Sequence, residues 1–414
     1  MRILVVNTYD IAGGAARAAY RLHRSLLEQE IESQMLVVGK SSDDFTVKKY
    51  DLNIKKIKSR LRTLQYRRFN PIENYPNKTK TLFSTSFLSF SNIVDVINEI
   101  NPDIVHLHWI CDEMIKIEDI AKIKAPIVWS LHDMWAFTGG CHYDEECGRY
   151  ADGCGKCKVL GSEDENDLSR TVFQRKQKTF SQIPNMTIVG LSRWLAGRAK
   201  NSSLFKDKNI VNLPNPINTT KYKPINKIIA REILSWPTDK KFILFGAMGA
   251  TSDPRKGFNE LQETISKIED INIELVVFGS SKPENAPKLK FKTYYLGQLH
   301  DGISLKILYS ACDVMVVPSL QENLSNAIME SLSCATPVIG FDIGGNSDLI
   351  DHKTNGYLAL PFDSDDLARG IEWVLNVENY DELCINARNK VLEKFDSKVV
   401  AKQYIELYKE VLHG

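Results

Sequence analysis

Apolar runs of four to six residues recur along the chain and alternate with stretches whose apolar positions follow a helical spacing. Runs this short, closed by glycine, proline or polar residues, are typical of strands buried on both faces of a parallel sheet. A strand, a helix and a second strand in this order form a parallel crossover unit. The pattern therefore predicts an α/β fold with parallel sheets. The predicted strands are residues 3–6, 104–109, 126–131, 187–191, 242–246, 273–278, 314–317 and 338–341.

The stretch 313–345 places two carboxylates close to the edge of a predicted sheet. Its first apolar run ends at Pro318, Glu322 follows in a loop, and Glu330 lies about two turns further along a predicted helix. Ligands of parallel sheets bind beyond the carboxyl ends of the strands. Two carboxylates there can hold the hydroxyls of a sugar or a ribose. For Glu322 alone, the alternative is an acidic helix start that complements the helix dipole.

A glycine pair, Gly13 and Gly14, separates the first predicted strand from a helix-like stretch at 15–26. Glycines at this place let backbone amides approach a phosphate, whose charge the helix N-terminus also favours. The sequence lacks the fuller G-x-G-x-x-G spacing of a dinucleotide site, so a simple turn is the alternative. Arg17, in the first turn, can contact the same ligand or lie in solvent.

The motifs taken together resemble a known family. Seven residues separate Glu322 from Glu330, and a small-residue turn at 334–338 and the glycine pair at 344–345 follow. This order resembles the retaining glycosyltransferases with two Rossmann-like domains, in particular the glycogen-synthase-like glycosyltransferase family 4 and its bacterial surface-polysaccharide members. Further matching stretches lie on both sides, so the resemblance covers nearly the whole chain.

The resemblance implies the GT-B fold, in which two Rossmann-like domains face each other across a cleft. Residues 1–213 then form an acceptor-side domain, and residues 214–395 form a nucleotide-sugar-binding domain. The final helix, 396–414, crosses back to complete the first domain. We place the boundary in the segment 213–217, because a helix cannot continue through its two prolines.

The resemblance also implies catalytic roles for His132, Lys256 and Glu322 and no catalytic metal. Lys256 stands beside a glycine in a loop after a strand, where its charge can neutralise a diphosphate. His132 follows the strand at 126–131, where it can bind a sugar hydroxyl with Asp133 to orient it. Glu322 is expected to hold the transferred sugar and Glu330 the ribose. The further donor contacts implied are Gly13, Gly14, Arg17, Thr251, Arg255, Gly279, Leu296, Asn323, Leu324, Ser325 and Asn326.

The chain departs from the family pattern at two places. Members usually carry an arginine five residues before the lysine, and this chain has Thr251 there. Its hydroxyl can donate to the phosphate, or Arg255 can substitute for the missing charge. Glycines that commonly follow the first glutamate are Asn323 and Ser325 here, whose side chains would narrow the sugar pocket.

Four cysteines, Cys141, Cys147, Cys154 and Cys157, fall within seventeen residues. In a reducing compartment, where disulfides are rare, such a cluster predicts a structural zinc site with four thiolate ligands. The sequence has a single C-x-x-C pair in this cluster, so free or redox-paired thiols are the alternative.

Composition and charge limit the possible partners and the cellular location of the protein. The chain has 414 residues, 43% of them hydrophobic, and a net charge of +1, which gives no reason to expect a nucleic-acid partner. The N-terminus lacks the features of a signal peptide, and no apolar run approaches the ~18 residues of a membrane span. We expect a cytoplasmic protein. The basic, helix-like segment 48–69 can lie on an anionic membrane surface at the inner face, or it can dock on its own domain.

The function implied is transfer of a sugar, with retention, from a UDP or GDP sugar to a glycan or lipid-linked acceptor in the biosynthesis of a capsule, exopolysaccharide or O-antigen. Three alternatives stay open. A nucleotide-sugar epimerase would share the fold and the nucleotide contacts, and a sugar phosphorylase would need a cofactor lysine. A non-catalytic nucleotide-sugar-binding protein at the membrane would not need the two glutamates.

Overall fold

The computed structural model describes residues 1–50, 71–87, 92–246, 249–270, 272–282, 289–299 and 301–414. These residues form two compact units. The N-terminal unit comprises Met1–Asn215 and Ala401–Gly414, and the C-terminal unit comprises Pro216–Val400. The chain passes from one unit to the other inside the proline-containing segment 213–217.

The described strands of the N-terminal unit form a seven-stranded sheet in the order β3-β2-β1-β4-β5-β6-β7, and every neighbouring pair is parallel. The strand order reverses at β1, which lies between β2 and β4. In open α/β sheets, ligands bind beside such a switch point. The strands are β1 (Arg2–Val6), β2 (Glu32–Val37), β3 (Val47–Lys49), β4 (Ile104–Leu107), β5 (Ile127–Leu131), β6 (Thr187–Gly190) and β7 (Asn209–Asn212).

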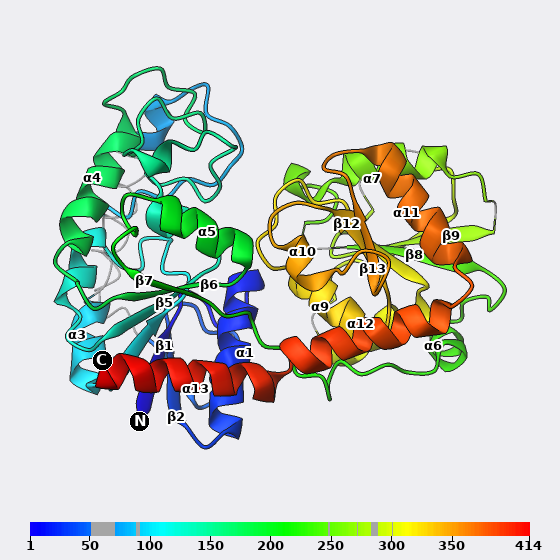
Figure 1. The fold of residues 1–414 in the computed structure, drawn as a ribbon, viewed down its shortest axis with the longest axis horizontal. Helices are drawn as coiled ribbons and strands as arrows, with labels where there is room; N and C mark the ends of the chain where they lie inside the picture. The colour runs from blue at the N-terminus through cyan, green and yellow to red at the C-terminus, as the bar shows by residue number, and fades with distance from the viewer. Residues whose placement is uncertain (51–70, 88–91, 247–248, 271, 283–288, 300) are drawn as a thin grey trace. The chain divides into compact units, whose positions relative to one another are not determined.

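Helices and short 3₁₀ turns connect these strands (Figure 1). Asp167 caps α4 by accepting from the amides of Ser169 and Arg170, and Ser192 caps α5. The elements are α1 (Gly14–Glu28), η1 (Pro71–Asn74), α3 (Ile93–Ile100), η2 (Ile117–Lys122), η3 (Trp135–Phe137), η4 (Arg149–Ala151), α4 (Leu168–Phe180), α5 (Arg193–Asn201) and α13 (Ser397–His413).

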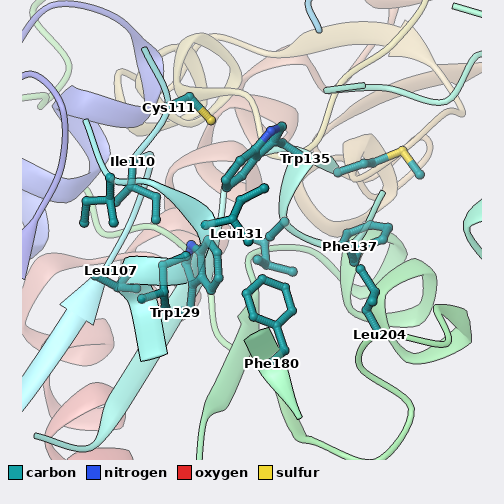
Figure 2. Packing of buried hydrophobic residues seen from close by; sticks show 14 of the residues in the cluster. Leu107, Ile110, Cys111, Trp129, Leu131, Trp135, Phe137, Phe180 and Leu204 are labelled. Atoms are coloured by element: carbon teal, nitrogen blue, oxygen red, sulfur yellow. The ribbon is translucent and has the colours of Figure 1, made fainter. Parts of the chain in front are cut away.

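Large side chains fill the core of the N-terminal unit (Figure 2). The ring of Trp129, on β5, lies 6.2 Å from the ring of Trp135 and meets Phe180 of α4 edge-on at 5.8 Å, measured between ring centroids. Leu131 lies between the two tryptophans in the close view. Burying a side chain of this size contributes roughly 1.5–3 kcal/mol, so this cluster holds β5 and the loop after it in place.

The described strands of the C-terminal unit form a six-stranded parallel sheet in the order β10-β9-β8-β11-β12-β13. Helices α7 and α11 cover one face, and α9 and α12 lie on the other (Figure 1). The strands are β8 (Lys241–Gly246), β9 (Ile273–Phe278), β10 (Thr293–Tyr295), β11 (Val314–Val317), β12 (Val338–Phe341) and β13 (Gly356–Ala359). The helices are α6 (Lys227–Ile233), η5 (Pro254–Lys256), α7 (Phe258–Lys267), α8 (Gly302–Ala311), α9 (Asn326–Ser333), α10 (Asn346–Leu349), α11 (Ser364–Asn376) and α12 (Tyr380–Lys394).

The predicted fold class is confirmed, since both units are parallel α/β domains. The crossing of the last helix is confirmed too. Helix α13 begins in the C-terminal unit, and its residues from Ala401 onward belong to the N-terminal unit. There, Tyr404 and Tyr408 are fully buried. The two tyrosine hydroxyls lie within hydrogen-bond distance of Ser130 on β5 and His106 on β4, respectively.

The predicted basic helix at 48–69 is wrong at its start. Lys48 and Lys49 belong to β3, because Val47–Lys49 pairs with Met35–Val37 of β2. The rest of that segment, from residue 51, lies outside the described residues. Among the helices that the structure describes, none combines the length and the apolar character needed to cross a bilayer.

Candidate active site

Three loops meet at the carboxyl edge of the C-terminal sheet, because they follow the adjacent strands β8, β11 and β12. The amide of Leu320 donates to the carbonyl of Arg255 at 2.8 Å, and the amide of Gly345 donates to the carbonyl of Glu322 at 3.3 Å. These bonds tie the three loops together and fix the backbone on which the predicted site residues stand.

Two glycines make this close approach possible. Gly257 and Gly344 have φ values of +74° and +53°. A Cβ at Gly257 would lie 1.8 Å from the carbonyl oxygen of Pro318, and a Cβ at Gly344 would lie 1.8 Å from that of Glu322. Any larger residue would therefore be strained in its backbone and would also displace the loop that carries Glu322.

Lys256 and Glu322, predicted separately, form an ion pair. Lys256 Nζ lies 3.0 Å from Glu322 Oε2, and the two side chains are 23% and 14% exposed. The pair comes from the loops after β8 and β11. Each charge compensates the other in a partly buried place. An anionic ligand that reaches Lys256 therefore competes with Glu322 for the ammonium group, and the carboxylate becomes available to a hydroxyl.

Glu330 lies in α9 and is 4% exposed. Tyr309 of α8 donates from its hydroxyl to Glu330 Oε2 at 3.0 Å. Burial, and then the charge of Glu330, raise the pKa of Tyr309 well above its ordinary value, so the phenol stays a donor. Sequence reasoning did not find Tyr309, because the two residues lie on different helices.

The residues between the two glutamates begin α9. The predicted helical spacing included Leu324, but the helix starts at Asn326, because the hydroxyl of Ser325 caps it by accepting from the amide of Ile328 at 3.4 Å. Asn323, Leu324 and Ser325 are all buried.

Thr251, Gly279 and Leu296 lie at the same edge of the C-terminal sheet. The hydroxyls of Thr251 and Ser280 are 2.5 Å apart, which joins the loops after β8 and β9. The amide of Gly279 donates to the carbonyl of Gly297 at 2.7 Å, and that of Leu296 donates to Val277 at 2.9 Å. The structure thus brings these predicted donor contacts to neighbouring loops.

Arg255 is held by its own loop. Its Nη2 and Nε donate to the two carboxylate oxygens of Asp253 at 2.8 and 3.1 Å. Burial acts against ionisation, but the hydrogen bonds and charge of Arg255 hold the pKa of Asp253 below its ordinary value. A phosphate would have to compete with this carboxylate for the guanidinium.

In the N-terminal unit, Gly13 precedes α1 with a φ of +103°, and Gly14 is the first residue of the helix. Arg17 Nε donates to the carbonyl of Ile11 at 3.4 Å. The fully buried carboxylate of Asp10 accepts from the amides of Ile11, Ser41 and Ser42, so it joins the loops after β1 and β2. Sequence reasoning missed Asp10, whose partners are mostly distant in sequence.

His132 follows β5, and its Nε2 lies 2.9 Å from Nδ1 of His108, which follows β4. Asp133 was expected to orient His132, yet the hydrogen bonds described for Asp133 go elsewhere. It accepts from His142 Nδ1 at 2.6 Å, from Trp109 Nε1 at 3.1 Å and from the amide of Trp135. Burial lowers the pKa of His132 to about 4, so its ring is neutral near pH 7.

The C-terminal unit matches a known family over most of its length. Residues 239–377, which include β8 to β13, match the sequence profile described as "Glycosyl transferases group 1". This region is a glycosyl transferases group 1 domain. It contains the Lys256–Glu322 pair, Glu330 and the loops after β8 to β12. Gly13, Gly14 and His132 lie outside it, in the N-terminal unit.

Two curated relatives each match a little under half of the chain. An uncharacterised glycosyltransferase of Methanocaldococcus jannaschii is 32% identical over 193 residues, which cover 44% of this chain and 48% of that protein. An N,N'-diacetylbacillosaminyl-diphospho-undecaprenol alpha-1,3-N-acetylgalactosaminyltransferase of Campylobacter jejuni is 27% identical, over 47% of this chain and 53% of that protein. The chain thus spans about half the length of the curated relatives it matches.

Solved structures match the whole chain in fold. Sucrose-phosphate synthase from Thermosynechococcus elongatus has a TM-score of 0.69 at 17% identity, covering 99% of both chains. The HepE protein of Anabaena, in complex with UDP-glucose, has a TM-score of 0.62 at 14% identity, covering 99% of this chain and 100% of that one. The glycosyl transferases group 1 domain and the N-terminal unit therefore have the GT-B fold.

The predicted zinc site outside the glycosyl transferases group 1 domain is not supported. Among the residues that the structure describes, including Cys141, Cys147, Cys154 and Cys157, no group of three or more His, Cys, Asp or Glu side chains could hold a metal ion. Burial raises the pKa of all four thiols, that of Cys154 to about 12 and that of Cys157 to about 11. The amide of Gly139 donates to the sulfur of Cys154 at 3.1 Å. Three of these cysteines are buried, and Cys147 is half-buried.

Proposed function

We propose that the protein is a retaining glycosyltransferase that moves a sugar from a nucleotide-sugar donor to a glycan or lipid-linked acceptor, in the biosynthesis of a surface polysaccharide. The observation that carries the proposal is the Lys256–Glu322 pair. It lies at the carboxyl edge of a parallel sheet, within a glycosyl transferases group 1 domain. A cation and a carboxylate at that edge suit a ligand that combines a diphosphate with a sugar.

In this proposal the two units have different roles. The C-terminal unit binds the donor nucleotide, and the N-terminal unit serves the acceptor side. Lys256 neutralises the charge that develops on the departing diphosphate, and such a contact is worth about 2–4 kcal/mol of the barrier. Once the diphosphate binds Lys256, Glu322 holds a hydroxyl of the transferred sugar. Glu330, held by Tyr309, binds the ribose hydroxyls.

The N-terminal unit has its own proposed contacts. The backbone amides of Gly13 and Gly14, at the start of α1, add a positive dipole end that favours the donor phosphates. Arg17 lies in the first turn of the same helix. His132 binds a hydroxyl of the sugar. In this scheme the leaving phosphate accepts the proton of the acceptor hydroxyl, so the transfer needs no separate base.

The chemistry of donor and acceptor is supported by related proteins. The structure of HepE was solved with UDP-glucose. The Campylobacter jejuni relative is named for transfer to a diphospho-undecaprenol-linked sugar. A UDP sugar as donor and a polyprenyl-diphosphate-linked sugar as acceptor are therefore the first compounds to test.

The test is an assay of the purified protein with a panel of UDP and GDP sugars, with and without a polyprenyl-linked acceptor. We expect nucleotide release that depends on the acceptor and a product whose anomeric configuration, read by NMR, matches that of the donor. Sugar isomerisation without an acceptor would establish an epimerase instead. Donor binding with no turnover under any condition would establish a binding protein, and the proposal would be wrong.

A further inference from the structure

A group of histidines links the ends of two neighbouring strands in the N-terminal unit. His106 lies in β4 and His108 just beyond it, while His132 lies just beyond β5. Because β4 and β5 pair in parallel, the three rings come close together. The ring centroids of His106 and His108 are 4.3 Å apart, and those of His108 and His132 are 5.2 Å apart.

Hydrogen bonds extend this group to the last helix of the chain. His106 Nδ1 lies 2.7 Å from the hydroxyl of Tyr408 on α13, which is 302 residues further along the chain. His106 Nε2 lies 2.8 Å from the hydroxyl of Ser130 on β5. His106, Ser130 and Tyr408 are all fully buried. The ring of His106 is thus fixed through both of its nitrogens, and His108 packs against it.

The surroundings of His108 decide where the protons lie. His108 is 3% exposed, and its Nδ1 shares a hydrogen bond with His132 Nε2. Its other nitrogen, Nε2, is buried and has no hydrogen-bond partner among the described residues. A neutral imidazole carries one N–H, so one of the two paired nitrogens must donate and the other accept.

Two proton arrangements satisfy that bond, and they differ at the buried nitrogen. If His132 Nε2 donated, His108 would carry its proton on Nε2 and leave a buried N–H without an acceptor. If His108 Nδ1 donates, the unpartnered atom is a lone pair, and His132 carries its own proton on Nδ1. Orphaned buried N–H groups are the rarer and more costly case.

We propose that His108 is a positioning residue that holds His132 as the Nδ1–H tautomer, so that His132 donates to a hydroxyl oxygen of the sugar from Nδ1. The role in transfer rests on the proposed function, but the tautomer is a property of the free protein. Burial lowers the pKa of His132 to about 4 and that of His106 to about 3, and it lowers the pKa of His108 well below its ordinary value. All three rings are therefore neutral near pH 7.

The direct test is the ¹⁵N NMR spectrum of protein labelled at histidine, without ligand, at neutral pH. We expect His132 to show a protonated Nδ1 and a bare Nε2. His108→Asn keeps an N–H donor near the Nδ1 position and should preserve this pattern, whereas His108→Leu should lose it. A His132 ring that is protonated on Nε2 or is charged would overturn the proposal, as would an unchanged pattern in His108→Leu.

A kinetic test separates positioning from a loss of stability. We expect His108→Leu to lower kcat at least about tenfold with a smaller change in donor KM, and His108→Asn to recover most of the rate. The control is His23→Asn, another buried histidine of this unit, whose ring bonds Ser33 and Thr46 away from His132. It should leave the His132 spectrum unchanged. Equal rates in His108→Leu and the wild type would contradict positioning, whereas absence of transfer by the wild type would contradict only the proposed function.

Discussion

A pair of polar side chains at the carboxyl edge of one sheet contrasts with a pair at the same edge of the other sheet. At the edge of the N-terminal sheet, His108 and His132 are hydrogen-bonded to each other and neutral, because burial lowers the pKa of each ring. At the edge of the C-terminal sheet, Lys256 and Glu322 form an ion pair and keep part of their surface in solvent. The histidine pair is polar without charge, whereas the Lys256–Glu322 pair is charged.

The difference follows from the cost of burying charge. An ionised group that leaves water needs a partner or some remaining exposure, and otherwise it becomes neutral. The histidines become neutral, whereas Lys256 and Glu322 keep both a partner and some exposure. A neutral pair of rings suits sugar hydroxyls, and a lysine in an ion pair suits a diphosphate. In the proposed function, His132 accordingly binds a sugar hydroxyl and Lys256 binds the diphosphate.

The sharpest way to break this comparison is to remove the cation. We expect Lys256→Ala to lower kcat at least about tenfold. If the lysine contacts the diphosphate in the transition state, the barrier should rise by about 2–4 kcal/mol. It also leaves Glu322 without its partner. The measurement is kcat and KM with the donor identified by the screen.

The matched control is Lys267→Ala in helix α7 of the same unit. Lys267 pairs with Glu263 and Asp365, at 3.0 and 2.8 Å. We expect this variant to keep the wild-type rate. Equal losses in the two variants would mean that Lys256 has no special role.

Acidification should weaken the N-terminal unit. The folded-state pKa values of His106 and His132, about 3 and about 4, lie below the ordinary 6.5. As the pH falls below 6.5, these histidines bind protons in the unfolded chain but not in the folded one. Their contribution to the free energy of unfolding is therefore largest above pH 6.5 and decreases below it. Between about pH 7.5 and 5.5, each of the two histidines should lower the free energy of unfolding by about 1.4 kcal/mol. Together they should lower it by about 3 kcal/mol.

The measurement is the urea midpoint at both pH values, with limited proteolysis to show which unit opens first. We expect cleavage in the N-terminal unit. His352→Asn, which alters an exposed histidine of the C-terminal unit, should not change the pH dependence. A midpoint that stays constant or rises on acidification would show that the buried rings are already charged.

A methyl group at Gly344 should disturb the loop that carries Glu322 without removing a charge. Gly344→Ala combines an unfavourable backbone angle with a Cβ that would lie 1.8 Å from the carbonyl oxygen of Glu322. We expect a loss of about 2 kcal/mol in the free energy of unfolding, together with a lower rate of transfer. Gly148→Ala is the control, because Gly148 has a φ of +66° but nothing lies within 4 Å of its added Cβ. If both variants lose the same stability, the contact with Glu322 is unimportant.

The smallest effect is expected at Thr251, where the family usually has an arginine. Thr251→Val removes the hydroxyl that bonds Ser280 and keeps the shape of the side chain. We expect kcat/KM to fall about fivefold, which corresponds to about 1 kcal/mol, the contribution of a typical hydrogen bond. Thr220→Val, at an exposed threonine that bonds Asn218, is the control. A larger fall than in Lys256→Ala would mean that Thr251 has taken over the phosphate contact.

The sequence predicted the central strands well, because strands such as β11 and β12 are buried on both faces and consist almost wholly of apolar residues. It did not predict β2, β3, β7, β10 or β13. The residues of β2 mix polar and apolar types, β3 has two exposed lysines, and β7 is an edge strand that starts and ends with asparagine. Such strands are defined by their neighbours more than by their own composition.

The sequence predicted the individual residues of the site but not the contacts between them. Lys256 and Glu322 are 66 positions apart, and His106 and Tyr408 are 302 apart, so no local pattern reveals that they meet. The cysteine cluster is a case in which a local pattern was visible but the structure does not support the site that it suggested. Its spacing suggested a metal, but ligand spacing along a chain does not ensure that the sulfur atoms converge on one point.

The path of α13 determines how the gene can be divided. A fragment that stops at Asn215 would encode every strand of the first sheet yet leave out Tyr404 and Tyr408, which cover Ser130 and His106. Without α13, Ser130 and His106 would lose these hydrogen-bond partners and would be exposed to water. A chimaera that takes residues 1–215 from this chain should therefore also take the segment from Ala401 onward, because the two segments fold as one unit.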